Sequence, residues 1–192
     1  MTRIYTLKKR AQSQAETRRR IVEATVDLHG SLGPALTTFS MVAERAGVQR
    51  HTLYAHFPDE RSLFMACSAL SMERDPLPEA APWREIVDRR ERLHVGLTAI
   101  YGWYGRNAEL AACVLRDAEY HPLTKEVIEL RMGPYMSAYE EILGAGLSTK
   151  QQAVLRLALS FFTWRTLVRE GGLKPVAAVG TMVEAIECAK ER

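Results

Sequence analysis

Six polar or aromatic side chains between residues 49 and 56 have the chemistry that a nucleic-acid contact requires. Glutamine and arginine can pair with base edges, whereas threonine and tyrosine hydroxyls and histidine imidazoles can reach phosphates. No acidic residue lies among them, so the segment would not repel a phosphate backbone. The alternative is an ordinary solvated helix in an all-helical protein. The six residues are Gln49, Arg50, His51, Thr52, Tyr54 and His56.

The surrounding residues predict two short helices joined by a tight turn. Thr38 or Ser40 can cap a first helix over residues 41–46, and Gly47 can supply the turn because left-handed backbone costs glycine little. Pro58 ends the second helix. The apolar positions of that helix, which would face inward, are Val48, Leu53 and Phe57. Two short helices joined by a glycine turn are the unit that places its second helix in the DNA major groove.

Three consecutive motifs occur in this segment: A-E-R-A-G-V at residues 43–48, T-L-Y-A-H-F at 52–57 and D-E-R-S-L at 59–63. They resemble the N-terminal DNA-binding domain of the tetracycline-repressor (TetR) family of bacterial transcription regulators, over residues 17–64 or about a quarter of the chain. The resemblance implies a three-helix head that binds double-stranded operator DNA and a helical body that binds a small-molecule effector. It also implies a homodimer formed through the last two helices.

Two positions depart from the family pattern. Glu60 stands where the family often has a lysine that touches phosphate, and Arg61 could take over from the neighbouring position. His51 fills a place that is commonly glycine or another small residue. Glu60 supports a second hypothesis, which is a helical interaction protein that retains the fold without regulated DNA binding.

Positive charge is concentrated near the N-terminus. Residues 1–57 carry nine Lys or Arg and four Asp or Glu, whereas the net charge of the whole chain is +3. Arg18 opens a run of three arginines near the start of a predicted helix, where cations oppose the helix dipole and a phosphate contact would explain them. A basic head on a slightly acidic body fits a DNA-binding end attached to another domain. We therefore add Arg18 and Thr38 to the predicted DNA contacts.

Local patterns divide the chain into three parts. Residues 1–13 lack apolar periodicity and predict a flexible basic arm, and residues 14–74 predict the helix-turn-helix domain with a connecting helix. Three prolines between residues 75 and 82 mark a boundary, and residues 75–192 predict an effector-binding and dimerisation domain. Helices are expected at 14–32, 83–105, 108–119, 122–143, 149–170 and 175–190. No alternating strand pattern is present, so the predicted fold class is all-α.

Composition and motifs disfavour several other classes of protein. The hydrophobic content of 47% is ample for a core, and no run approaches the roughly 18 apolar residues of a membrane span. The cationic N-terminus lacks the apolar stretch of a secretory signal, so a cytoplasmic location is expected. The sequence contains no phosphate-binding glycine loop and no nucleophile-elbow or zinc-protease motif. A helical enzyme is therefore the least favoured hypothesis, and neither cofactor nor metal is expected.

Aromatic and methionine residues are abundant on the predicted helices of the body. The two interpretations are plain core packing and an apolar cavity with a few polar groups, which is the usual form of a small-molecule site. The second interpretation predicts an apolar or aromatic effector, not a nucleotide or a sugar. The candidate ligand-binding residues are Tyr101, Trp103, Tyr104, Arg116, Met132, Met136, Phe161, Trp164 and Arg165.

The last two predicted helices have more apolar surface than one partner can cover. Phe161, Phe162, Trp164 and Leu167 cannot all face inward, because successive helical positions turn by about 100°. The alternatives are burial within one subunit and a dimer interface, with Val179 expected at an outward position of the last helix. We favour the dimer. The sequence thus predicts a dimeric, ligand-responsive repressor that binds a pseudo-palindromic operator and is released by its effector.

Overall fold

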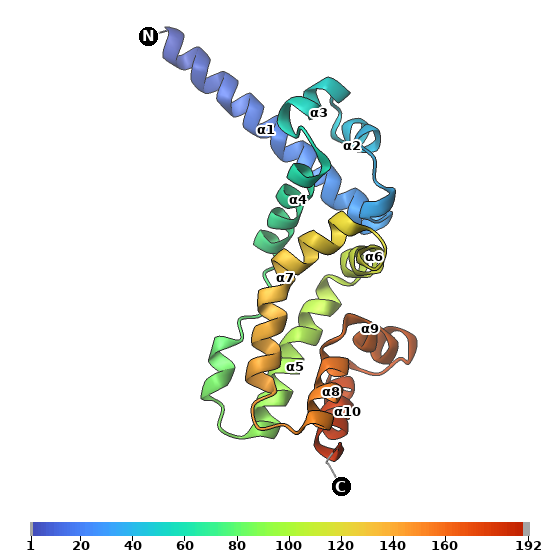
Figure 1. Ribbon diagram of the computed structural model, residues 1–192. Helices are drawn as coiled ribbons and strands as arrows, with labels where there is room; N and C mark the ends of the chain where they lie inside the picture. Colours follow the sequence, from blue (N-terminus) through green and yellow to red (C-terminus); the bar gives the residue numbers. More distant parts are fainter. Residues whose placement is uncertain (1, 190–192) are drawn as a thin grey trace. The chain divides into compact units, whose positions relative to one another are not determined.

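The computed structural model describes residues 2–189, and every regular element in that range is a helix (Figure 1). The all-α prediction is therefore confirmed. None of the described helices combines the length and the apolar character that crossing a membrane requires. The α-helices are α1 Thr2–Ser31, α2 Phe39–Ala46, α3 Arg50–His56, α4 Glu60–Arg74, α5 Arg89–Arg106, α6 Ala108–Ala118, α7 Pro122–Leu143, α8 Thr149–Leu159, α9 Phe161–Trp164 and α10 Pro175–Cys188.

Helix α1 begins at Thr2 and not at Gln14, so residues 2–13 are helical where the sequence predicted a flexible arm. The reason is local composition. Residues 7–12 are Leu, Lys, Lys, Arg, Ala and Gln, which are all good helix formers, and no glycine or proline precedes Gly30. Met1 lies outside the described residues.

Two of the helices predicted in the body are shorter than expected. The helix expected from residue 83 begins only at Arg89, where the Asp88 carboxylate caps it by accepting the Glu91 N–H at 2.7 Å. The helix expected over residues 149–170 is interrupted at Ser160, which has an extended backbone and whose Oγ accepts the Phe162 N–H at 3.2 Å. A π-helix then runs over Arg165–Glu170. Side chains that can cap a helix thus create both breaks.

The described chain forms two compact units. The first comprises the residues up to Pro76 together with Ala112–Ile128, and the second comprises Leu77–Ala111 together with the chain from Glu129 onward. The chain therefore leaves the first unit inside the proline-rich segment. Residues 112–128, which the sequence analysis placed in the body, belong to the unit that contains the helix-turn-helix.

Apolar side chains of α1–α4 form the core of the first unit. Leu53, in the middle of α3, and Phe57, which follows the helix, are buried, as the sequence predicted. They pack with residues of the other three helices, which include Ile21, Val42 and Leu63. On α1 the first buried residue among those whose burial is described is Ile21, so the core of the head begins there.

Residues near the end of α6 hold the loop between α1 and α2. The buried carboxylate of Asp117 accepts the Ala35 N–H at 2.9 Å, and Arg116 donates to the Leu32 carbonyl at 3.0 Å. The Cys113 thiol lies 3.4 Å from the Gly30 carbonyl. The Arg116 and Cys113 contacts serve carbonyls at and just beyond the end of α1, which otherwise have no helical partner, and the Asp117 contact serves an amide N–H of the loop. They explain why residues 112–128 pack with the head.

The same unit buries one imidazole. His29 packs edge-on against Phe64, with ring centroids 4.6 Å apart, and its Nδ1 lies 3.6 Å from the Cys67 sulfur. Burial lowers the pKa of His29 to about 4, so the ring is neutral at neutral pH. It therefore serves as part of the packed interior and not as a surface cation.

Gly33→Ala is predicted to destabilise the first unit by about 3 kcal/mol, measured as the free energy of unfolding in urea. The Gly33 φ angle is 100°, and an added Cβ would collide with the side chains of Asp117 and Arg116. Gly146→Ala is the matched control, because its φ is also positive at 76° but no described atom lies within 4 Å of the added Cβ. The control should cost about 1 kcal/mol, from backbone strain alone. Equal losses for the two variants would contradict the steric argument.

Candidate functional site

The turn between α2 and α3 has the geometry that the sequence predicted. Thr38 caps α2, since its Oγ1 accepts the Met41 N–H at 3.3 Å. Gly47 has left-handed backbone (φ 64°, ψ 41°), and the Val48 N–H donates to the Ala43 carbonyl at 2.9 Å. This hydrogen bond and the buried side chain of Leu53 hold α3 against the head.

Helix α3 presents most of the predicted contact residues to solvent. Gln49, Arg50, His51 and Tyr54 are exposed, whereas Thr52 and His56 are half-buried. The Tyr54 ring packs against Phe39, with centroids 5.1 Å apart, which limits the directions its hydroxyl can take. No Asp or Glu occurs between Glu44 and Asp59. The exposed surface of α3 is therefore polar or cationic and free of acids.

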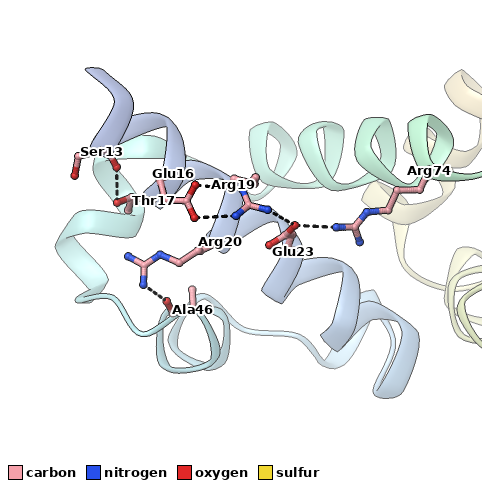
Figure 2. Close-up of polar contacts among 8 residues, drawn as sticks. All are labelled: Ser13, Glu16, Thr17, Arg19, Arg20, Glu23, Ala46 and Arg74. Atoms are coloured by element: carbon pink, nitrogen blue, oxygen red, sulfur yellow. Dashed lines mark hydrogen bonds and ion pairs between the residues drawn. The ribbon is translucent and has the colours of Figure 1, made fainter. Parts of the chain in front are cut away.

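The three consecutive arginines of α1 contact the protein itself, and Figure 2 shows the contacts of Arg19 and Arg20. Arg20 donates to the Ala46 carbonyl at 3.2 Å, at the end of α2, and the Arg18 guanidinium lies 4.6 Å from the centre of the Phe57 ring. Arg19 pairs with Glu16 at 2.8 Å and with Glu23 at 3.1 Å. The hydrogen bond from Arg19 lowers the pKa of the Glu16 carboxyl. A phosphate contact is thus not needed to explain Arg19 and Arg20.

Glu23 links α1 to α4. Its carboxylate accepts hydrogen bonds from Arg19 and from Arg74, the latter at 2.9 Å (Figure 2). The side chains of Glu23, Arg19 and Arg74 are all partly exposed to solvent, so the network contributes little to stability. It does order the two guanidinium groups. Arg18 is the arginine of this run that lies beside α3. Its guanidinium stacks on the ring of Phe57, which directly follows that helix.

The two family departures lie on the exposed surface. Glu60 is the first residue of α4 and is exposed. Arg61 pairs with Glu126 at 2.8 Å, in the segment that joins the first unit from later in the chain. Both side chains of this pair are more than half exposed, so the pair is weak and Arg61 can exchange partners.

Four of the predicted ligand-binding residues form one buried aromatic cluster in the second unit. The rings of Tyr104, Phe161 and Trp164 lie 5.4–6.1 Å apart, and Tyr101 is 6.3 Å from Tyr104. Burial raises the pKa of both tyrosines well above the usual value. The cluster by itself is consistent with the core-packing interpretation.

Hydrogen bonds from the two tyrosines accompany the break after α8. The Tyr101 hydroxyl donates to the Ala158 carbonyl at 3.0 Å, and the Tyr104 hydroxyl donates to the Leu159 carbonyl at 2.6 Å. The interruption at Ser160 would otherwise leave these carbonyls short of helical partners. Both hydroxyls are thus engaged by the protein, whereas the buried Nε1 of Trp164 has no hydrogen-bond partner among the described residues.

The other predicted ligand residues do not join this cluster as a group. Arg116 belongs to the first unit, where it pairs with Asp117 and the end of α1. Arg165 pairs with Glu170 at 3.0 Å. Trp103 contacts Tyr104 with centroids 5.8 Å apart. Met132 and Met136 lie on α7 and are half-buried.

Asp117 is the residue that sequence reasoning missed. Its partner Ala35 is 82 positions away, so no local pattern could reveal the contact. The described residues contain no group of three His, Cys, Asp or Glu side chains placed to bind a metal ion.

Comparison with known proteins agrees with the geometry of the head. The sequence model described as bacterial regulatory proteins, tetR family, matches residues 21–67. The head of this chain thus matches the tetR family over these residues. The matched range contains the whole helix-turn-helix and ends within α4. A search of curated proteins gives no match.

Solved structures share the fold of most of this chain. One is the fatty acid degradation regulator FadR from Bacillus halodurans, with a TM-score of 0.64 and 16% identity over 92% of this chain and 97% of that one. A second is FadR from Bacillus subtilis in complex with stearoyl-CoA, with a TM-score of 0.63 and 16% identity. The match covers 90% of this chain and 99% of that one. A third is a TetR-like transcriptional regulator from Rhodococcus sp. RHA1, with a TM-score of 0.62 and 21% identity. The match covers 89% of this chain and 93% of that one.

Proposed function

We propose that this protein is a dimeric transcription repressor that binds a pseudo-palindromic operator through α3 and is released by a small apolar or aromatic effector. The observation that carries the proposal is the exposed, acid-free surface of α3 on a tetR-family head. The chain's similarity in fold to three transcription regulators supports it.

In the proposed complex α3 lies in the major groove, with its first residues at base edges. Gln49 and Arg50 are exposed at that end of the helix and have the donors that read adenine and guanine. The other proposed contacts go to phosphates and are Arg18, Thr38, His51, Thr52, Tyr54 and His56. Thr38 remains suitable, because a hydroxyl that accepts a backbone N–H can still donate its own proton.

The effector is proposed to bind in the second unit, within the body formed from residue 75 onward. The Tyr104–Phe161–Trp164 cluster offers aromatic surface, and the unpartnered Trp164 N–H offers one donor for an acceptor group. The B. subtilis relative is in complex with stearoyl-CoA, a molecule with a long apolar chain, which supports an apolar effector here. Ligand and operator should then weaken each other's binding by the same factor, because coupling is reciprocal.

Selection of sequences from a random duplex library by the full-length protein tests the proposal. The enriched duplexes should contain two inverted half-sites, with centres one helical turn or a multiple of it apart. Failure to enrich any sequence, together with DNA binding that is absent at low salt, would favour the alternative of a helical interaction protein without regulated DNA binding.

Arg50→Ala is predicted to weaken binding to the selected operator by about 1–3 kcal/mol and to relax base preference at one position in each half-site. Thr52→Ala should weaken binding to all sequences alike, because a phosphate contact carries no sequence information. Fluorescence anisotropy with the operator and with a random duplex measures both. Arg84→Ala, which removes an exposed arginine of the second unit, is the control and should change neither. An equal loss on both duplexes for Arg50→Ala would make it a phosphate contact.

Glu60→Lys is predicted to strengthen DNA binding and to steepen its salt dependence by about one released counterion. The exposed carboxylate at the start of α4 stands where relatives often place a phosphate-binding lysine. Glu60→Gln removes the repulsion between the carboxylate and DNA phosphate without adding a cation. It should therefore raise DNA affinity without steepening the salt dependence. Unchanged affinity in both variants would show that Glu60 lies away from the DNA.

The dimer is proposed to form through apolar side chains that α8 and α10 leave exposed, namely Leu157 (56% exposed) and Val176 (69%). The expectation that Val179 faces outward was wrong, because it is only 1% exposed and packs inside its own unit. The double variant Leu157→Glu/Val176→Glu should give a monomer by light scattering at micromolar concentration, while its circular-dichroism spectrum remains helical at 25 °C. Val87→Glu, at a 95% exposed valine elsewhere, should leave the dimer intact. Val179→Glu should instead unfold the protein.

A further inference from the structure

Residues 9–16 of α1 contribute no buried side chain to the head. Residues 9–16 are all exposed, and the first buried residue of the helix whose burial is described is Ile21. A helix normally depends on the burial of one face for its stability and use within a protein. This stretch has no such role in the first unit, so its side chains are available to a partner outside the chain.

The charge of this stretch indicates what kind of partner it fits. Lys8, Lys9 and Arg10 are consecutive, and no Asp or Glu precedes Glu16. Glu16 itself is paired with Arg19. Cations in the first turns of a helix oppose its dipole, so local helix stability does not account for them. An exposed helical stretch with uncompensated positive charge is complementary to a polyanion.

Internal contacts place the stretch next to the helix-turn-helix. Arg20 donates to the Ala46 carbonyl at the end of α2, and Arg18 lies over Phe57 at the end of α3. Lys9 precedes Arg20 by eleven residues, which is about three helical turns, so the two side chains share an azimuth within about 20°. Lys9 thus lies on the face of α1 that meets the helix-turn-helix, about 16 Å further along. Figure 1 shows α1 continuing beyond α3.

We infer that residues 2–13 of α1 are a rigid DNA-contacting extension, with Lys9 and Arg10 on phosphates that flank the base pairs read by α3. The inference rests on the proposed DNA binding and adds a second, sequence-independent contact to it. DNA is the occupant because the cations continue the side of the head that carries the acid-free α3 surface. The helix presents them at fixed spacing, so less ordering entropy is lost on binding than with a disordered arm.

The test measures the affinity of the full-length protein for a random 30-base-pair duplex as a function of salt. In Lys9→Gln/Arg10→Gln the slope of log K against log salt should become shallower by about two, which corresponds to one counterion per lost contact. The control Lys150→Gln/Lys174→Gln removes two exposed cations of the second unit and should keep the wild-type slope. Melting temperatures should be equal in all three proteins, because none of these side chains is buried.

Ala11→Pro tests whether the helix itself matters. It retains every charge but interrupts α1 between the cations and the head. The slope should fall as in the double variant, and a wild-type slope for Ala11→Pro would overturn the rigid extension in favour of a flexible arm.

The outcomes separate the two proposals. A wild-type protein that binds no duplex at low salt contradicts the proposed function. A wild-type protein that binds, with the same slope in Lys9→Gln/Arg10→Gln, contradicts only the extension. Binding of the wild type to phosphatidylglycerol vesicles that the double variant loses, with DNA binding unchanged, would assign the stretch to a lipid surface and also overturn it.

Discussion

The buried charge of Asp117 is the constraint on which the first unit depends. A carboxylate removed from water is tolerated only where donors surround it. Burial raises the pKa of Asp117, but hydrogen bonds from Tyr120, the Ala35 N–H and Arg116 together outweigh burial and lower it. The carboxylate therefore stays ionised at neutral pH. One of its donors comes from the loop after α1, so the charge is satisfied only when residues 112–128 pack on the head.

The contact made by Asp117 also influences the position of α3. The loop that Asp117 holds leads from Gly33 to Thr38, and Thr38 is the cap of α2. Helix α2 in turn ends at Gly47, whose left-handed turn sets the direction of α3. Arg20 and Phe57 then connect both short helices to α1. The position of α3 therefore depends on a series of capping, turn and packing contacts, the first of which is made by one buried charge.

The second unit uses polar groups in a different way. Tyr101 and Tyr104 place their hydroxyls on carbonyls beside the break at Ser160, so an irregular backbone segment is tolerated inside an aromatic core. The π-helix that follows is a rare conformation that often accompanies functional sites. Trp164, at the junction, is 2% exposed and keeps an unpartnered N–H. The proposed effector contact rests on these features of the junction.

The sequence by itself determined the features that depend on neighbouring residues. The cap at Thr38, the turn at Gly47 and the buried register of Leu53 and Phe57 follow from local spacing, and the structure has each of them. Local spacing also favoured a flexible arm and one uninterrupted helix over residues 149–170. Both expectations failed because good helix formers without an apolar face still form helix, and because Ser160 can cap a new one.

Only the tertiary structure decided which distant residues meet. The Asp117–Ala35 hydrogen bond spans 82 positions, and it moves residues 112–128 from the predicted body into the first unit. The burial of Val179 and the internal partners of Arg19 and Arg20 also could not be predicted from the sequence. Helical periodicity shows that a face is apolar or charged, but the element that covers it is chosen by packing across the whole chain.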